Sequence, residues 1–234
     1  MSPQPPGSQD SRGSGSPLRN QIPVASLADF RARLDTRQVE GELEAIFRES
    51  PEFGRGLAQR LVSFLDEPQS GPLTLIAAGG EAAVFFDAAN QQVIKLCGPP
   101  ARCGFGWLIR RDPGGLLTLA PSGIDDFLDR LALFESLFPS GISIDCMGED
   151  DAFLVFRQPF ILGRHPTASG LATHLRSLGW TPHREPCLGE TLEHLTWKKG
   201  PYLATDVRPE NALVAESTGT IHPIDFIVAG KEIA

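Results

Sequence analysis

Two acidic side chains and one amide lie near the C-terminal end of the sequence, in a pattern suited to holding a metal ion. Asp206 and Asn211 are five residues apart in the segment Asp-Val-Arg-Pro-Glu-Asn. Pro209 stiffens this segment, because its ring restricts the backbone and removes an N–H donor. Asp225 follows after a stretch with the pattern of a β-hairpin. Because a hairpin returns the chain to its start, we expect Asp225 to lie beside Asn211.

The chemistry that this group would support is phosphoryl transfer. Amide and carboxylate oxygens are hard ligands, and Mg²⁺ takes few protein ligands together with substrate phosphates. Asn211 and Asp225 are therefore candidate Mg²⁺ ligands, and Asp206 remains to orient a hydroxyl group. Phosphoryl transfer needs a metal, charge neutralisation and a positioned nucleophile. The alternative is that Asp206 and Asn211 form only an Asx turn that shapes the loop, with Asp225 as a turn or capping carboxylate.

The elements that must position these side chains follow from the hydrophobic pattern. Helical spacing predicts helical segments within 26–67, an amphipathic helix over 123–138 and another helix over 168–178. Short apolar runs between turns predict strands at 73–76, 83–86, 93–96, 142–147, 152–158, 212–215 and 220–224. A hairpin is expected around 198–201. The segment 97–120 is rich in glycine and proline, and we expect a long loop there.

This order of strands, one long helix, further strands, and then a helix with short hairpins predicts an α+β fold. Four regions are expected, namely a disordered tail over 1–24, a helical region over 25–70, a strand-rich region over 71–160 and a C-terminal region over 161–234. The tail is short of the large apolar side chains that would offset the entropy of ordering. The helical region has a plain interpretation as packing support for the strands that follow it.

Composition and charge narrow the classes of function. The chain has 234 residues, of which 41% are hydrophobic, and a net charge of −8 at pH 7. A negative chain repels a phosphate backbone, so nucleic acid is not an expected partner. Because the sequence lacks an apolar run of about 18 residues, a membrane is not expected either. The first residues lack the apolar segment of a secretory signal, and the four cysteines lack Cys-x-x-Cys spacing. We therefore expect a cytoplasmic protein with reduced thiols.

The segment from Asp206 to Asn211 resembles the catalytic loop of Ser/Thr protein kinases, in which Asp-Leu-Lys-Pro-Glu-Asn is common. Asp225-Phe226 resembles the Asp-Phe-Gly element of that family at the matching downstream spacing. Val93-Ile94-Lys95 is similar to the strand that carries the family's phosphate-binding lysine. Gly79-Gly80-Glu81 falls where the glycine-rich loop belongs.

Three segments are similar, more narrowly, to the kinase family found in polyvalent proteins of phages and mobile elements. They are the Gly-Gly-Glu turn, the stretch that begins Gln158-Pro159-Phe160 and runs to Thr167, and Pro223-Ile224-Asp225. The likeness covers roughly residues 73–234. It implies a protein-kinase-like two-lobed fold, with the first lobe and hinge in 71–160, a truncated C-terminal lobe in 161–234 and an N-terminal helical extension.

The resemblance also implies ATP and Mg²⁺ as cofactors and assigns roles around them. Lys95 would contact the α- and β-phosphates under a loop formed by Gly79 and Gly80. Asp206 would be the catalytic base, and Arg208 would neutralise charge on the transferred phosphate.

Further roles concern the metal, the base of the nucleotide and the lysine. Asn211 and Asp225 would hold Mg²⁺. The stretch 157–160, which includes Gln158 and Phe160, would be the hinge that offers backbone groups to adenine. The helix over 123–138 would supply the acid that pairs with Lys95, and we choose Glu135 for that role ahead of Asp129.

Two functions follow from these implications and from the departures from the family pattern. The first is a kinase that moves the γ-phosphate of ATP to a hydroxyl acceptor, with protein Ser/Thr favoured and a small-molecule hydroxyl left open. The second is a weak or inactive nucleotide-binding pseudokinase that serves as a partner-binding module. It is motivated by Ala82 in place of the last loop glycine, by Ile227 in place of the glycine after Asp-Phe, and by the short distance from Asp225 to Ala234.

Overall fold

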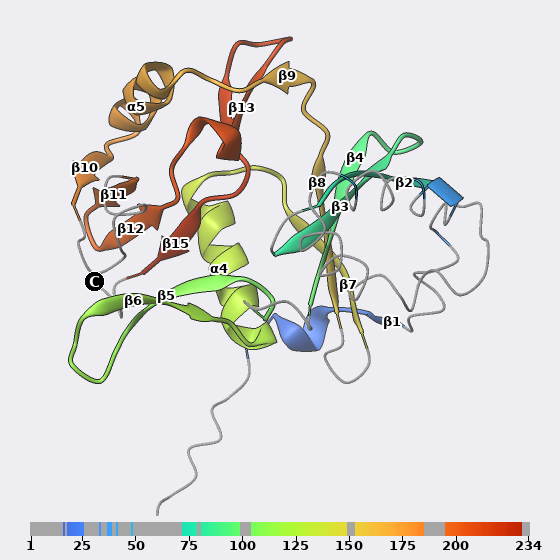
Figure 1. Ribbon diagram of the computed structural model, residues 1–234, viewed down its shortest axis with the longest axis horizontal. Helices are drawn as coiled ribbons and strands as arrows, with labels where there is room; N and C mark the ends of the chain where they lie inside the picture. Colours follow the sequence, from blue (N-terminus) through green and yellow to red (C-terminus); the bar gives the residue numbers. More distant parts are fainter. Residues whose placement is uncertain are drawn as a thin grey trace, which may run out of the picture.

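The largest sheet of the protein forms around the strand that carries Lys95. The computed structural model describes residues 16, 18–25, 33, 37–38, 41, 48, 72–78, 81–98, 104–148, 153–184 and 195–230. In this part, a 6-stranded sheet has the order β1-β7-β8-β4-β3-β2 (Figure 1). Its strands are β1 (Val24–Ala25), β2 (Leu73–Ala78), β3 (Ala82–Asp87), β4 (Gln92–Cys97), β7 (Ser143–Gly148) and β8 (Leu154–Pro159). Neighbouring strands are antiparallel, except that β1 runs parallel to β7.

A tight turn fixes the register between β3 and β4. The Asp87 carboxylate accepts hydrogen bonds from the backbone N–H and the Nδ2 of Asn90. Gln91 completes the turn with a φ of 51°, in the left-handed region. Alternate residues of β3 then face opposite sides of the sheet. Ala83 and Phe85 are buried in one hydrophobic cluster, whereas Val84 on the other side lines a cavity.

Helix α4 (Ile124–Leu137) joins two of the hydrophobic clusters. Most of its apolar stripe packs against the large sheet, in a cluster that includes Phe127, Leu128, Leu131, Leu154 and Phe156. Near its C-terminal end, Phe134 belongs to another cluster, formed mainly by the C-terminal part of the chain. Figure 1 shows α4 between the large sheet and the C-terminal strands. The helix therefore links the two parts of the fold that carry the candidate site residues.

Smaller sheets make up the C-terminal part of the described chain. A 4-stranded antiparallel sheet has the order β10-β11-β12-β15, with β10 (Thr181–His183), β11 (Thr196–Lys199), β12 (Tyr202–Thr205) and β15 (Ile227–Ala229). A 3-stranded sheet contains β14 (Ile221–Pro223), β13 (Ala212–Ala215) and β9 (Gly163–Arg164). Helix α5 (Ala168–Ser177) follows the N-cap residue Thr167, whose hydroxyl accepts the Gly170 N–H. A 3-10 turn, η4 (Pro209–Asn211), connects β12 to β13.

The expectation of a long loop over 97–120 is wrong. Strands β5 (Trp107–Arg111) and β6 (Leu117–Pro121) pair there as an antiparallel hairpin. Its turn is held by Asp112, whose side chain accepts the Leu116 N–H, and by Gly115 at a φ of 83°. Ile109 and Leu117 pack against β12 and β15. Glycine and proline before and inside the hairpin obscured two short apolar runs, which tertiary packing stabilises as strands.

The expectation of a disordered tail over 1–24 is wrong for its last residues. A 3-10 turn, η1 (Arg19–Gln21), precedes β1, and the Met147 N–H donates to the carbonyl of Pro23. Backbone pairing with an existing sheet and the packing of Ile22 against the hydrophobic cluster around α4 order this segment. Of the expected helical region over 25–70, positions 37–38, 41 and 48 are described and are helical, whereas Ala25 ends β1 and Arg33 lies in a turn. The other positions of this region lie outside the described residues.

Other expectations agree with the structure. The helix expected over 123–138 is α4, the helix expected over 168–178 is α5, and the α+β class is confirmed. Strands β9, β10 and β15 were not anticipated from the sequence. None of the helices in the described part is long and apolar enough to cross a membrane.

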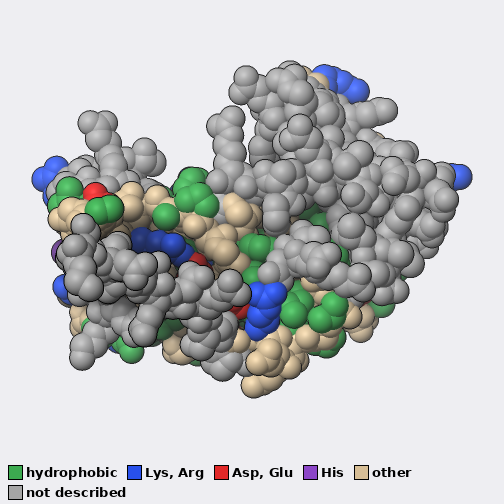
Figure 2. Space-filling view, turned by 90° about the horizontal axis from the view of Figure 1, so that it is seen from below, with side chains coloured by type: hydrophobic (Ala, Val, Ile, Leu, Met, Phe, Trp, Pro, Cys, Tyr) green, Lys and Arg blue, Asp and Glu red, His purple; other side chains and the backbone are tan. Residues whose placement is uncertain are grey.

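Hydrophobic side chains on the described surface are spread over separate elements. The face in Figure 2 mixes them with basic and acidic side chains. The large exposed ones are Val24, Ile76, Leu116, Leu162 and Leu178. Isolated apolar residues of this kind are normal on a protein surface.

Candidate active site

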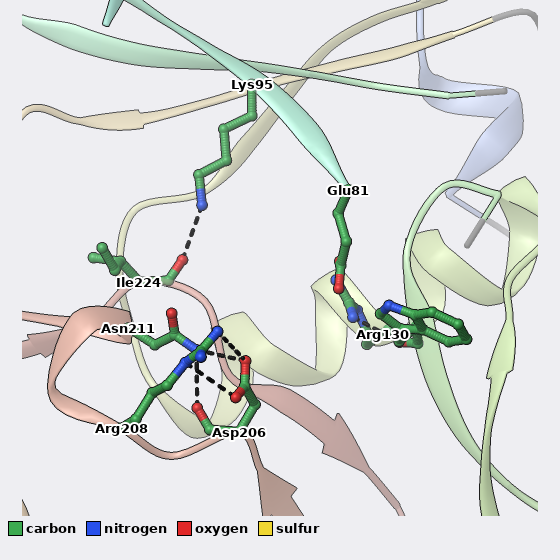
Figure 3. Close-up of polar contacts among 8 residues, drawn as sticks. Glu81, Lys95, Arg130, Asp206, Arg208, Asn211 and Ile224 are labelled. Carbon is green, nitrogen blue, oxygen red and sulfur yellow. Dashed lines mark hydrogen bonds and ion pairs between the residues drawn. The ribbon is translucent and has the colours of Figure 1, made fainter. Parts of the chain in front are cut away.

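Lys95 projects from β4 toward the C-terminal segments of the chain (Figure 3). Its strand lies between β3 and β8, where Val84 and Phe156 are its register partners. The residue is buried, at 9% exposure, and its Nζ donates a 3.0 Å hydrogen bond to the carbonyl of Ile224. Ile224 directly precedes Asp225. The ammonium group of Lys95 and the segment of Asp225 therefore belong to the same part of the site.

A compact loop holds Asp206 and Asn211 together. The Nδ2 of Asn211 donates to the Asp206 carbonyl at 2.9 Å and to its Oδ2 at 2.7 Å. The Nε of Arg208 lies 3.1 Å from the other carboxylate oxygen of Asp206. The loop is short because β12 ends at Thr205 and η4 begins at Pro209. Since Asn211 binds Asp206 through its nitrogen, its Oδ1 is directed away from Asp206 in Figure 3.

The hairpin of β13 and β14 brings the Asp225 segment back to this loop. The two strands pair in antiparallel register from Ala212 with Pro223 onward. Immediately after the hairpin, the Ile224 N–H donates a 2.9 Å hydrogen bond to the Asn211 carbonyl. Ile224 thus binds Asn211 through its N–H and Lys95 through its C=O. One residue connects the lysine strand to the loop.

Burial raises the pKa of the Asp206 carboxyl above its ordinary range. The positive charge of Arg208 and the hydrogen bond from Asn211 oppose this shift, whereas the nearby charges of Asp225 and Glu210 add to it. The net effect makes Asp206 a stronger base than an exposed aspartate. A carboxylate with a raised pKa is better suited to accept a proton from a hydroxyl group.

A cavity of about 830 Å³ contains these groups. Its walls come from the large sheet, α4, the β5–β6 hairpin and the C-terminal segments. Its lining includes the polar residues Glu81, Lys95, Arg130, Gln158, Asp206, Arg208, Glu210, Asn211 and Asp225. The remaining lining is mostly apolar, as with Val84, Val93, Phe160 and Leu213. Ligand pockets in proteins have volumes of about 300–1,000 Å³, with apolar walls and a few placed polar groups.

Two of the expected hinge residues, Gln158 and Phe160, line this cavity. Gln158 is buried in β8, and its Oε1 has no hydrogen-bond partner within the described residues. The ring of Phe160 packs against Phe86, with centroids 4.6 Å apart. The backbone N–H of Phe160 donates to the carbonyl of Gln91, so that this group is already used within the protein. Phe160 lines the cavity, and the role of the stretch 157–160 as a hinge toward adenine stays a prediction.

The donor set of the cavity fits Mg²⁺ with a polyphosphate. The Oδ1 of Asn211 is not used in binding Asp206, and Asp225 is exposed at the cavity. Within the described residues, no group of three or more His, Cys, Asp and Glu is arranged to hold a metal ion unaided. Mg²⁺ is commonly held by one or two protein ligands plus phosphates. Asn211 and Asp225 would be those ligands.

The expected pairing of Lys95 with Glu135 is not made. Both carboxylate oxygens of Glu135 accept hydrogen bonds from the turn after α4, namely from Ser140, Gly141 and Ile142. The second choice, Asp129, accepts the hydroxyl of Ser16 at 2.7 Å. Glu135 is therefore a structural residue at the end of the helix. Gly79 and Gly80 lie outside the described residues.

An ion pair between Glu81 and Arg130 was not anticipated from the sequence. The Nη2 of Arg130 lies 3.5 Å from the Oε2 of Glu81, and both residues line the cavity. Arg130 stands next to the apolar stripe of α4, where a charged residue is unusual. A charged residue at this position of the helix is the feature of the sequence that could have pointed to Arg130. The sequence places Glu81 in the Gly-Gly-Glu turn, with no charged partner assigned to it.

The thiol at the cavity is not a candidate nucleophile. Cys97 is a buried free thiol, as expected for a reduced cysteine. Burial raises its pKa to about 12, so it stays protonated at neutral pH. The candidate chemistry of the cavity therefore belongs to its carboxylates and cations.

Comparison with known proteins adds no relative: no model of a protein family matches the sequence, and neither does any curated protein. The assignment of function consequently depends on the geometry of the cavity and on the motifs that line it.

Proposed function

We propose that this protein is a kinase-like phosphotransferase that uses ATP and Mg²⁺ and transfers the γ-phosphate to a hydroxyl group. The observation that carries the proposal is the convergence of Lys95, Asp206, Asn211 and Asp225 on one cavity. These residues come from a strand of the large sheet and from two C-terminal segments that are separated by a hairpin. Contacts between distant segments, such as the hydrogen bond from Lys95 to the Ile224 carbonyl, bring them together.

Each side chain has a role that its surroundings support. Lys95 would bind phosphate oxygens, since its ammonium group has only the carbonyl of Ile224 as a hydrogen-bond acceptor within the described residues. Asn211 and Asp225 would hold Mg²⁺, which neutralises phosphate charge when it is bound. The Arg208 guanidinium is half exposed beside Asp206 and would approach the transferred phosphoryl group.

Asp206 would act as the base. The acceptor oxygen attacks the γ-phosphorus, the bond from that phosphorus to the bridging oxygen breaks, and ADP leaves. The proton of the acceptor hydroxyl passes to the Asp206 carboxylate. Its hydrogen bond from Asn211 fixes the orientation of the carboxylate, and burial strengthens it as a proton acceptor.

We also propose the finer description of the fold as a two-lobed kinase-like architecture. The large sheet with α4 would be the first lobe, and the C-terminal sheets with α5 would be a reduced second lobe. The separate hydrophobic clusters of the large sheet and of the C-terminal part support this division. The nucleotide base would lie near Gln158 and Phe160, where the walls are apolar. Protein Ser or Thr is the favoured acceptor.

One observation favours a second candidate, a nucleotide-binding module without transfer. The Asp206 carboxylate is engaged on both oxygens, by Arg208 and by Asn211. If these contacts persist when a nucleotide binds, no acceptor hydroxyl gains access to the base. The protein would then bind Mg²⁺ and ATP and present a surface to a partner.

A transfer assay with ATP labelled on the γ-phosphate separates these functions. The acceptors would be the protein itself, a mixture of Ser- and Thr-containing peptides, and a mixture of small alcohols and sugars. Asp206→Ala should lower the rate at least a hundredfold, because base catalysis contributes about 10²–10⁴. Glu216→Ala, at an exposed turn residue outside the cavity lining, is the matched control and should keep the wild-type rate. Equal labelling by wild type and Asp206→Ala would overturn the catalytic proposal, and binding without transfer would favour the module.

A further inference from the structure

The cavity contains a buried arginine to which the proposed mechanism assigns no role. Arg130 comes from the middle of α4, and its side chain is 6% exposed, yet it lines the cavity. A buried guanidinium loses its hydration, and that loss must be offset by good partners. The contacts of Arg130 show how much of this lost hydration its partners within the protein replace.

Two contacts hold Arg130 firmly. Its Nη1 donates a 2.6 Å hydrogen bond to the carbonyl of Trp107, the first residue of the β5–β6 hairpin. Its guanidinium stacks over the ring of Phe127, one turn earlier in α4, at 4.6 Å from the ring centroid. Neither contact supplies a negative charge. They fix the orientation of the group and leave its charge to be balanced by another partner.

The one acid that faces Arg130 within the described residues is a loose partner. Glu81 lies 3.5 Å away, at the long limit for a hydrogen bond. Burial raises the pKa of Glu81, and so do the charges of Asp225 and Asp206, whereas Arg130 lowers it. Glu81 is thus one of several acids around the cavity, and its contact with Arg130 is long for a charged pair.

The chain makes room for this pair at Gly106. A Cβ atom on that residue would lie 2.8 Å from the Oε2 of Glu81 and 2.6 Å from the Phe127 ring. Side chains with a Cβ do not fit at such distances. The absence of a side chain at 106 lets Glu81 and the Phe127 ring, on which Arg130 stacks, both approach the cavity.

Arg130 and Lys95 line the same cavity, together with Cys97. Both cations lower the pKa of the Cys97 thiol, against the larger effect of burial. Lys95 reaches the cavity from β4, whereas Arg130 reaches it from α4, as Figure 3 shows. A polyanion in the cavity would meet one cation from the sheet and one from the helix.

We propose that Arg130 is a second phosphate-binding residue, which exchanges Glu81 for the phosphates of the bound nucleotide. This inference rests on the proposed function and names the part of the ligand that Arg130 recognises. The planar guanidinium offers several N–H donors that match phosphate oxygens, and Trp107 and Phe127 have already oriented it. Glu81 balances the charge of Arg130 until the nucleotide arrives.

Binding measurements on adenosine and on Mg²⁺ with ATP test this inference without requiring catalysis. Isothermal titration would compare the wild type with Arg130→Met and Arg130→Lys. Charge-assisted hydrogen bonds contribute about 1.5–3 kcal/mol, so Arg130→Met should weaken ATP binding about ten- to a hundredfold and adenosine binding less than about twofold. Arg130→Lys should give an intermediate loss for ATP, because it keeps the charge without the planar group.

Arg110→Met provides the matched control. Arg110 also pairs with an acid of α4, Asp126, but it is exposed and does not line the cavity. This variant should bind ATP as the wild type does. An equal loss in Arg110→Met would mean that net charge alone sets the affinity, which would overturn the inference.

The remaining outcomes are distinct. If Arg130→Met and Arg130→Lys both keep the wild-type ratio of ATP to adenosine affinity, Arg130 is a structural residue and the inference fails while the proposed function stands. If Arg130→Met does not fold, Arg130→Lys decides by the same ratio. If the wild type binds neither adenosine nor ATP, the proposed function itself fails.

Discussion

At the scale of single residues, Asp206 has an unusual backbone conformation. Its φ is 57°, in the left-handed region that residues with a Cβ rarely occupy. The hydrogen bonds from the Asn211 side chain to its carbonyl and carboxylate hold it there. Backbone strain of this kind is concentrated at functional sites, where it costs about 1–3 kcal/mol. The backbone conformation and the buried charge of Asp206 both lower the stability of the fold. The proposed function needs both of them at this position.

Replacing Asp206 should therefore separate stability from activity. We expect Asp206→Asn to abolish transfer while keeping or raising the free energy of unfolding at pH 7, because Asn tolerates the left-handed region and carries no buried charge. Asp206→Ala should be less stable than Asp206→Asn by about 1 kcal/mol, since Ala lacks that tolerance. Urea denaturation would measure all three proteins.

The pH dependence provides the check on this explanation. The pKa of Asp206 is raised in the folded protein, so folding favours its protonated form and stability falls as pH rises through that pKa. The free energy of unfolding of Asp206→Asn should thus exceed that of the wild type at neutral pH. The difference should shrink as the pH falls toward 3.8, the ordinary pKa of an aspartate. If the difference in free energy of unfolding between the two proteins did not change with pH, the buried charge of Asp206 would not be its cause.

At the scale of elements, Glu135 determines how α4 ends. Burial alone would raise its pKa, but hydrogen bonds from Ser140, Ile142 and Gly141 outweigh that effect and lower it. Because this pKa is lowered, the ionised form of Glu135 stabilises the fold at pH values above the ordinary pKa of a glutamate. This contribution is lost as the pH falls through the pKa that Glu135 has in the folded protein. The carboxylate organises the passage from α4 to β7.

We expect Glu135→Gln to lower the free energy of unfolding at pH 7 by about 1–3 kcal/mol, because a neutral amide cannot accept the same set of charged hydrogen bonds. The difference from wild type should disappear in acid. Denaturant titrations at pH 7 and at lower pH would measure it, with Glu216→Gln as the exposed control. A loss of ATP binding without a loss of stability would instead return Glu135 to the site.

The β5–β6 hairpin is the other element whose packing supports the cavity. Ile109 is buried at 1% exposure against the C-terminal sheet, whereas Leu116 at the tip is 56% exposed. Ile109→Ala should cost about 2–5 kcal/mol, since it leaves a cavity in a packed cluster. Leu116→Ala should change stability by less than about 0.5 kcal/mol. Similar losses for the two variants would show that the hairpin does not pack as described.

At the scale of the whole molecule, the cavity lies between parts of the fold that have separate hydrophobic clusters. Helix α4 contributes to two of them, and the hydrogen bond from Lys95 to Ile224 crosses between the two parts. A ligand that contacts both sides should stabilise the arrangement as one unit. Binding to the folded state alone stabilises it in proportion to the logarithm of ligand concentration.

Mg²⁺ with ATP should therefore raise the melting temperature. At a hundredfold excess over Kd, the gain in free energy of unfolding is about 2.7 kcal/mol. Lys95→Met should remove most of this gain because it deletes a phosphate contact, whereas Lys198→Met, on an exposed strand position, should keep it. Thermal melts with and without nucleotide would decide, and an unchanged gain in Lys95→Met would contradict the role of that lysine.

Local patterns in the sequence predicted much of the site. The sequence predicts Lys95 on a strand. It also predicts the loop and the hairpin that carry Asp206, Asn211 and Asp225, because turns and strand alternation are local properties. The charged partners were not predictable in the same way. Arg130 and Glu135 flank the apolar stripe of α4, about 140° apart around the helix, so periodicity alone does not say which one faces the cavity.

The amino-acid sequence by itself determined the α+β class, the main helices and most strands, since these depend on the spacing of apolar residues along short segments. Only the tertiary structure decided that Glu81 faces Arg130, that Glu135 binds the turn after its own helix, and that 107–121 forms a hairpin. Those outcomes depend on how α4 is rotated against the sheet and on which distant strands bury each other. Packing between segments that are distant in the sequence determines these contacts, and local sequence patterns do not predict such packing.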